Sequence, residues 1–194
     1  MGQAQANNEE CFTYDTNKNY FGKSNWADPN SNLMLSTFMI LNRTVSTEEI
    51  IVLKETRHAH ESTRFVANLA NLWLFDKNLT DLVCGIKLII PQKVKFSSDR
   101  FDIPMGAIDF DGTTDSYASV PPGAYFRTQN SQFTISVWVL YKTINRMRVF
   151  DFGDGHQSNN VILGISGIQL NFWGFQGSVS CMHIIANEAM ILNQ

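Results

Sequence analysis

The sequence predicts an all-β fold, a mostly antiparallel β-sandwich or jelly roll with one or two short helices. Phe or β-branched apolar residues recur with a period of two over residues 133–140, alternating with Thr134, Ser136, Trp138 and Leu140, as in a strand. Turn signals, many of them glycines, recur about every ten residues in the second half of the chain, which is typical of sandwiches. The 194 residues include 14 Phe and 4 Trp, which provide large apolar area for a packed core.

The composition excludes several classes of protein. Hydrophobic residues make up 44% of the chain and charged residues 17%, which is unlike a disordered polypeptide. A formal net charge of −3 gives no general positive field, so no nucleic-acid partner is expected. No run of about eighteen apolar residues occurs, and we therefore expect no membrane insertion.

Local patterns in the first part of the chain predict loops, one long strand and one helix. Residues 1–32 are rich in Asn, Asp, Ser and Gly and are expected to form loops with one or two short strands. Residues 33–41 are apolar on both faces, which favours a strand buried on both sides. Ser46 and Glu49 have the spacing of a capping box, so a short helix is expected from Ser46 to Lys54.

The middle of the chain contains a candidate boundary. Residues 57–64 are strongly polar and are expected to form a helix surface or a linker. Short strands are expected at residues 72–75 and 83–94, the second interrupted by Pro91, which cannot donate to a central ladder.

The second half has the clearest strand pattern. Residues 107–120 are expected to form a hairpin around the Gly-containing turn 111–115. Further strands are expected where apolar runs are bounded by turn residues, at residues 133–140, 149–152, 161–165 and 168–173.

Several of these segments together resemble a known family. The segments are residues 70–76, 108–112, 115–117, 120–121 and 133–139. In this order they resemble the opening strands of the laminin-G-like family, which has the concanavalin-A-like lectin-glucanase jelly roll. Residues 177–189 are similar to the closing segment of that family, a glycine-led strand followed by Asn and a short helix. The resemblance therefore implies a second helix at residues 187–192.

The resemblance also implies a division into two units. Residues 35–46 are similar to the same closing segment, although they precede the opening strands. We therefore expect residues 1–60 to be a polar tail with the C-terminal remnant of one module, and residues 70–194 to be a shortened second module. The second unit is short for the family, which implies a fragment or a shortened gene product.

The cysteines bound the possible cross-links. Cys11, Cys84 and Cys181 are far apart and odd in number, so at most one internal disulfide can form and no CxxC motif exists. The family resemblance implies an extracellular or secreted protein. Residues 1–10 are polar and lack the positive-then-apolar order of a secretory signal.

Acidic and amide side chains in turns suggest a calcium site, because calcium prefers oxygen ligands. One candidate set is Asp109, Asp111 and Asp115, and a separate set is Asp151, Asp154 and Asn159. The second set is our predicted metal site, and calcium is the only cofactor that we expect. The alternative interpretation is that these side chains only cap backbone groups in turns.

Ligand contacts are predicted at Trp26, Trp173, Asp111 and Asp115. The apolar face of a sugar ring packs well on an exposed indole. Trp26 and Trp173 lie beside polar or Gly residues, whereas Trp73 and Trp138 lie in apolar strands and are expected in the core. Burial of Trp26 and Trp173 in the core is the alternative interpretation.

Catalytic motifs are missing from the sequence, and we expect no enzyme activity. No Glu-x-Asp-x-x-Glu arrangement of paired glycosidase carboxylates occurs, and neither does Gly-x-Ser-x-Gly. His58, His60, His156 and His183 are not accompanied by Cys or carboxylates at zinc-ligand spacing.

The family resemblance implies a non-enzymatic recognition or adhesion module in an extracellular or matrix setting. Its expected partner is a glycan or an extracellular protein, bound through rim loops at residues 111–115 and 153–160. Two alternatives stay open, a structural matrix component without a discrete ligand and a vestigial glycosidase-like domain.

Overall fold

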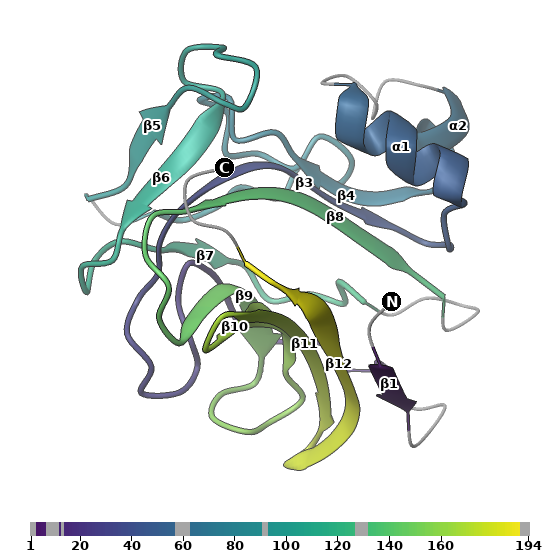
Figure 1. Ribbon diagram of the computed structural model, residues 1–194, viewed down its shortest axis with the longest axis vertical. Helices are drawn as coiled ribbons and strands as arrows, with labels where there is room; N and C mark the ends of the chain where they lie inside the picture. The colour runs from purple at the N-terminus through teal and green to yellow at the C-terminus, as the bar shows by residue number, and fades with distance from the viewer. Residues whose placement is uncertain are drawn as a thin grey trace.

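The protein is an antiparallel β-sandwich with two helices on one outer face (Figure 1). The computed structural model describes residues 3–6, 12, 14–56, 63–90, 93–126 and 132–190. The predicted all-β class is therefore confirmed. Neither described helix has the length or the apolar character that a membrane crossing requires.

The larger sheet has seven strands, all paired antiparallel to their neighbours. In spatial order they are β1 (Gln3–Ala6), β12 (Val179–Ala189), β11 (Gln169–Gln176), β10 (Val161–Ser166), β9 (Met147–Gly153), β2 (Lys18–Phe21) and β7 (Ala118–Val120). Strands β9 to β12 follow one another in both sequence and space, so this half of the sheet is a simple meander.

The smaller sheet has five strands and is organised around β3. Its members are β4 (Leu69–Trp73), β3 (Asn32–Leu41), β6 (Ala107–Asp111), β5 (Lys95–Ser97) and β8 (Thr134–Tyr141). Strand β8 pairs with β3 along nearly its whole length, whereas β6 pairs with the first half of β3 and β4 with the second half. Strands β4 and β6 therefore share one edge of β3, and β8 has the other.

The space between the sheets is filled mainly by aromatic side chains. Phe21 on β2 is fully buried, and its ring centroid lies 4.8 Å from that of Phe38, 5.9 Å from Trp73 and 5.4 Å from Phe152. Phe38 also lies 5.4 Å from Phe150. Because these rings come from β2, β3, β4 and β9, one aromatic cluster connects the two sheets.

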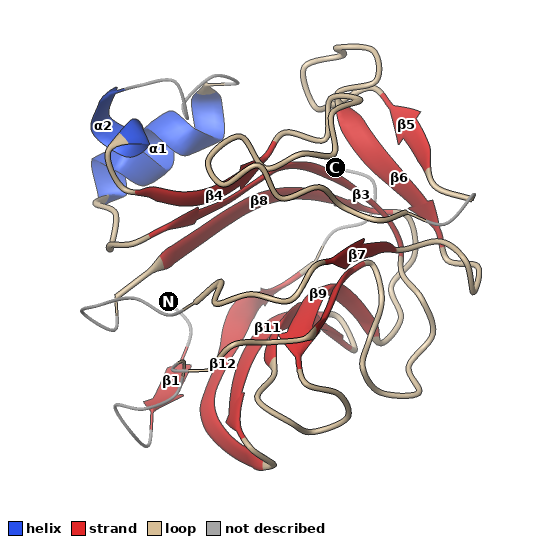
Figure 2. Cartoon of the chain, turned by 180° about the vertical axis from the view of Figure 1, so that it is seen from behind, coloured by secondary structure: helices blue, strands red, loops and turns tan. Residues whose placement is uncertain are grey.

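Helices α1 (Thr47–Glu55) and α2 (Thr63–Val66) lie over the outer face of the five-stranded sheet (Figure 2). A smaller apolar cluster joins the helices to this sheet. Its buried members are Met39, Leu41, Leu53, Phe65 and Leu72. Ser46 caps α1 with the reciprocal Glu49 contact of a capping box, so the helix predicted from Ser46 to Lys54 is confirmed. Helix α2 was not predicted.

Four expectations from the sequence are wrong. Residues 107–120 do not form a hairpin, because β6 and β7 lie in different sheets and the turn between them crosses the sandwich. Of the segment expected to be a strand at residues 83–94, Lys87 and Ile89 form only isolated bridges, and residues 91–92 lie outside the described part. Residues 187–189 continue strand β12 instead of beginning a helix, and residues 191–194 lie outside the described part. Trp138 is half-buried on an outer face and is not a core residue.

The pairing of strands joins the two units that the resemblance implies. Strand β3, which belongs to the first expected unit, pairs with β4, β6 and β8 of the second. Strand β2 likewise pairs with β7 and β9. We therefore describe both segments as one sandwich with a common core.

The central position of Phe21 predicts a large loss of stability on truncation. We expect Phe21→Ala to lower the free energy of unfolding by about 3–5 kcal/mol, because the lost ring contacts are added to a cavity between the sheets. Urea unfolding followed by fluorescence measures this. The matched control is Phe101→Ala at an exposed position, where less than about 1 kcal/mol is expected. Equal effects of the two changes would contradict the central role of Phe21.

Candidate functional site

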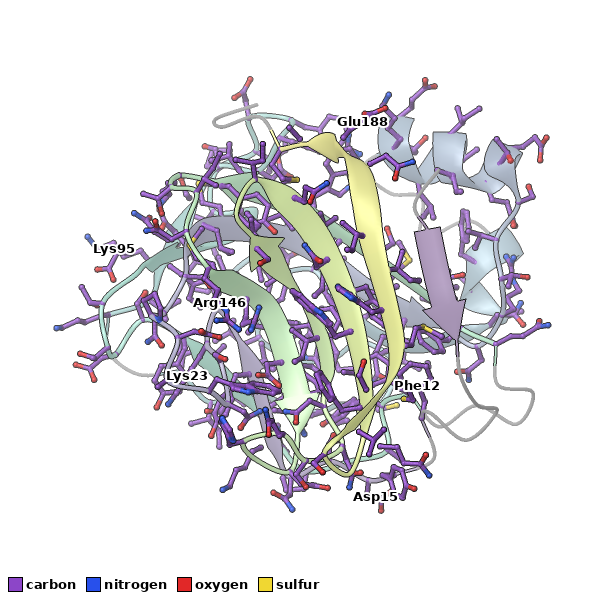
Figure 3. The ribbon with its side chains drawn as sticks, turned by 60° about the horizontal axis from the view of Figure 1, so that its bottom comes forward. Phe12, Asp15, Lys23, Lys95, Arg146 and Glu188 are labelled. Carbon is purple, nitrogen blue, oxygen red and sulfur yellow. The ribbon has the colours of Figure 1, made fainter. Side chains whose placement is uncertain are left out.

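Polar and aromatic side chains gather on the outer face of the seven-stranded sheet, which Figure 3 shows from the front. Arg148 lies on this face although Phe150 and Phe152 of the same strand point into the core, because the register of β9 against β10 shifts between Phe150 and Arg148 and reverses the alternation there. Trp173 on β11 pairs in register with His183 on β12, and both side chains lie on this same face. We call the surface formed by Trp26, Arg148, Asn171, Trp173 and His183 the tryptophan face.

Arg148 lies at the centre of the tryptophan face. Its guanidinium carbon is 5.0 Å from the ring centroid of Trp173 and 5.9 Å from that of Trp26. Nη2 is 2.9 Å from a carboxylate oxygen of Asp28, and only 5% of the Arg148 side chain is exposed. Burial lowers the pKa of Arg148, against the opposing effect of Asp28.

Two donors of this guanidinium are left without a partner. Nε and Nη1 of Arg148 are buried and make no hydrogen bond to any part of the protein that the structure describes. A buried donor without an acceptor costs about 1–3 kcal/mol. The tryptophan face therefore contains a buried cation with hydrogen-bonding capacity that the described protein groups do not use.

Trp173 and His183 form a stacked pair beside Arg148. Their ring centroids are 5.2 Å apart, and the ring planes are inclined by only 15°. His183 Nε2 lies 2.9 Å from Oδ1 of Asn171, whose Nδ2 donates to the carbonyl of Gln169. Burial lowers the pKa of His183, which favours the neutral imidazole.

Trp26 is held by the loop between β2 and β3. Its backbone N–H donates to Ser24 Oγ at 3.0 Å, and that hydroxyl donates to Asp28. The indole is half-buried and lies 5.4 Å from the ring of His156 and 5.8 Å from that of Phe175. The loop therefore brings a second indole next to Arg148, on the same face of the sheet as Trp173.

Asp151 connects the loops that border the tryptophan face. Its Oδ1 accepts from the side-chain amides of Asn25 (3.0 Å) and Asn160 (2.8 Å), and its Oδ2 accepts from the backbone N–H of Asn25 (2.8 Å). The carboxyl group is fully buried, and desolvation raises its pKa despite these bonds. Asp151 therefore positions the loop that carries Trp26.

The other two predicted calcium ligands lie together in the turn after β9. Asp154 accepts from the backbone N–H of Asn17 and from Nδ2 of Asn159, while Asn159 Oδ1 accepts from the N–H of Gly177. Both side chains therefore cap backbone groups, but those groups belong to Asn17 and Gly177, which lie outside the turn, rather than to local backbone. Within the described ranges, no group of three or more His, Cys, Asp or Glu side chains has the arrangement of a metal site. Calcium binding stays a prediction.

The predicted ligand contacts divide between two places. Trp26 and Trp173 lie on the tryptophan face, whereas Asp111 and Asp115 lie in the turn after β6. Asp111 accepts from the hydroxyl and the N–H of Thr113, which lowers its pKa, and Asp115 is 3.6 Å from Lys93. No contact between described residues joins either aspartate to an indole of the tryptophan face.

Sequence reasoning missed Arg148, Asn171 and Asp28, and it considered His183 only as a zinc ligand. A cation within the apolar run 147–152 was an available signal for Arg148. The positions of Asn171 and Asp28 depend on which strands and loops become neighbours.

The cysteines divide into two states. Cys181 is disulfide-bonded, while Cys84 is free and exposed.

Comparisons with family models, with curated proteins and with solved structures found no match to this chain. The resemblance to the laminin-G-like family stays a prediction.

The environment of His183 predicts a pH effect on stability. Because the folded-state pKa lies below the ordinary value of 6.5, the unfolded chain binds this proton first as the pH falls. The contribution of neutral His183 to the free energy of unfolding is fully present above pH 6.5, and it is lost as the pH falls through the lowered folded-state pKa.

We expect the His183→Gln variant to lose less of its free energy of unfolding than the unchanged protein when the pH falls from about 7.5 to 5. Urea unfolding at each pH measures this difference. The control is His156→Gln, since His156 is exposed. If His183→Gln and the unchanged protein lose stability equally over this range, the assignment is wrong.

Proposed function

We propose that this chain is a non-enzymatic recognition module that binds a glycan at the tryptophan face in an extracellular or matrix setting. The observation that carries the proposal is the pair of half-buried indoles, Trp26 and Trp173, that lie beside Arg148 on one face of the sheet. A ligand with a flat apolar surface and polar groups at its edge complements this arrangement.

A pyranose ring has both properties. Its C–H face packs on an indole, and its hydroxyl groups exchange hydrogen bonds with polar side chains beside the ring. Asn171 and His183 add planar polar groups at the side of Trp173. Such planar groups match the paired hydroxyls of a sugar, which supports a glycan over a purely apolar ligand.

The geometry of the two acidic residues supports binding without hydrolysis. Glycosidases place two carboxyl groups on either side of the scissile bond, where both reach the substrate. Asp28 is 2.9 Å from Arg148 and only 11% of its side chain is exposed, while Asp151 is fully buried and accepts three hydrogen bonds from two asparagines. Both carboxyl groups are committed to the structure of the face.

The rim loop at residues 153–160 borders the proposed site. His156 in this loop is exposed and its ring lies 5.4 Å from Trp26. This loop therefore belongs to the proposed glycan surface, and the second rim loop, residues 111–115, is retained as a separate candidate contact. The tryptophan face, rather than the two rim loops, is therefore the centre of the proposed glycan site.

Binding should depend on both indoles of the tryptophan face. A glycan array identifies the ligand, and titration calorimetry then measures its affinity. We expect Trp173→Ala and Trp26→Ala each to weaken binding by about tenfold, as the loss of about 1.4 kcal/mol of ring contact predicts. Arg148→Met removes the guanidinium that lies beside both indoles, and it should weaken binding at least as strongly because both rings lose the group that positions them.

The matched control is Trp138→Ala, which removes a half-buried indole from the other sheet. This variant should bind like the unchanged protein. Equal affinity for Trp26→Ala, Trp173→Ala and the unchanged protein would sink the proposed site. Binding to an extracellular protein but to no glycan would favour the other predicted partner class.

A further inference from the structure

The loop after strand β4 carries an Asn-x-Thr triplet, Asn78-Leu79-Thr80, which the proposed function does not use. Asn-x-Ser/Thr, with any residue except proline in the middle, is the acceptor motif for N-linked glycans on secreted proteins. The motif occurs once more in the chain, at Asn42-Arg43-Thr44. Because such triplets also arise by chance, a glycan site additionally requires an asparagine side chain that is exposed and free to react.

The side chain of Asn78 meets this requirement. Asn78 is exposed, whereas Leu79, between the two motif residues, packs against the core of the sandwich. The loop therefore has a fixed inner side, and the Asn78 amide lies on its outer side. Nδ2 of Asn78 donates no hydrogen bond to any residue that the structure describes. A sugar on this nitrogen would consequently displace no described contact of the folded chain.

A local hydrogen bond holds the triplet in shape. The backbone N–H of Thr80 donates to Oδ1 of Asn78 at 3.0 Å, which makes the triplet an Asx-turn. The bond joins two residues of the motif itself, so the turn can form before distant strands have paired. This timing matters because N-linked glycans are transferred to nascent chains.

The second triplet is held by long-range contacts instead. The backbone N–H of Asn42 donates to the carbonyl of Asn68 at 2.9 Å, and Thr134 Oγ1 donates to the carbonyl of Arg43 at 2.7 Å. These partners are distant in sequence and are absent while the nascent chain emerges. The local geometry therefore favours Asn78 as the acceptor.

A disulfide supports passage through an oxidising compartment. Cys181 is disulfide-bonded. Disulfides form and persist in the lumen of the endoplasmic reticulum and outside the cell, and they are rare in the cytosol. The same lumen contains the machinery for N-linked glycosylation. One compartment would therefore supply both modifications.

The loop that begins with the triplet also exposes large apolar side chains. The N–H of Leu88 donates to the carbonyl of Leu79 at 2.9 Å, which closes the loop. Within the loop Leu82 is 52% exposed and Val83 44%, and Ile89, directly after it, is 67% exposed. Exposed apolar groups that gather in one place are an aggregation liability. A bulky and solubilising glycan at the start of this loop offsets that liability.

We propose that Asn78 is the acceptor of an N-linked glycan. Nδ2 of Asn78 attacks the anomeric carbon of a lipid-linked diphosphate oligosaccharide, and the new N–C bond forms as the bond from that carbon to the diphosphate oxygen breaks. The lipid diphosphate leaves, and the amide nitrogen loses one proton. The Thr80 hydroxyl completes the motif that the transferase recognises. The proposal rests on the extracellular setting of the proposed function, and it is independent of ligand binding at the tryptophan face.

The test is expression of the whole chain in cultured animal cells behind a cleavable secretion leader. The chain carries Asn42→Gln, so that residues 78–80 are the one triplet left in the sequence. Chains from medium and cell lysate are counted once the leader is cleaved, because cleavage shows that they entered the lumen. We expect them to be heavier than their sequence mass. Peptide-N-glycosidase F should remove the added mass and convert the linked asparagine to aspartate, which peptide mass spectrometry locates at residue 78.

Four variants in the same background separate the acceptor from its recognition. Asn78→Gln removes the acceptor, and Thr80→Ala removes the hydroxyl but keeps the asparagine, so each should lose the whole added mass. Thr80→Ser keeps a hydroxyl and should retain the added mass. The matched control is Asn17→Gln, a change at an exposed asparagine outside any triplet, which should also retain it.

Two results would overturn the proposal. One is that leader-cleaved chains have their unmodified sequence mass, and the other is that the added mass survives Asn78→Gln. Binding at the tryptophan face is measured separately, through the effect of Trp173→Ala on glycan affinity. The failure of either proposal is therefore distinguishable from the failure of the other.

Discussion

The aromatic cluster between the sheets is the interaction on which the rest of the structure depends. Phe21 contacts rings from both sheets, and the aromatic residues of β9 continue the cluster toward Phe126. Because successive residues of a strand point to opposite faces, burying Phe150 and Phe152 turns Asp151 outward, and the register shift between Phe150 and Arg148 places Arg148 on the same face. The packing of the core therefore places the polar groups of the tryptophan face, and that face could not be altered independently of the core.

Local patterns predicted those elements whose formation depends on near neighbours. Strands β8 to β11 follow from alternation and from glycine turns, and α1 follows from the capping box of Ser46 and Glu49. The choice of sheet is a long-range property, and here local reasoning failed. Residues 107–120 have the turn chemistry of a hairpin, yet Ile108 packs beside β3 while Ser119 pairs with Tyr20. Residues 187–189 lengthen β12 because β11 offers a partner up to Gln169.

The candidate site was predictable to a similar degree. Trp26 and Trp173 were distinguished by their polar or Gly neighbours, and the structure places both indoles beside Arg148. Asp151 was predicted as a metal ligand because a carboxylate near a turn is a common ligand, whereas two of its three hydrogen bonds come from Asn25, which is distant in sequence. No pattern within β9 indicates Asn25 as its partner. The neighbours of a side chain, rather than its type, distinguish a positioning role from a binding role.

The placement of β2 has a consequence for biosynthesis. Lys18–Phe21 pair on one side with residues 118–120 and on the other with residues 150–153. A ribosome must therefore complete most of the chain before this strand has either neighbour, and the aromatic cluster around Phe21 cannot close earlier. Pairing over such sequence separations is slow and leaves apolar strands exposed during synthesis. The nascent chain therefore passes through a long interval in which Phe21 and the first half of β3 are accessible to chaperones.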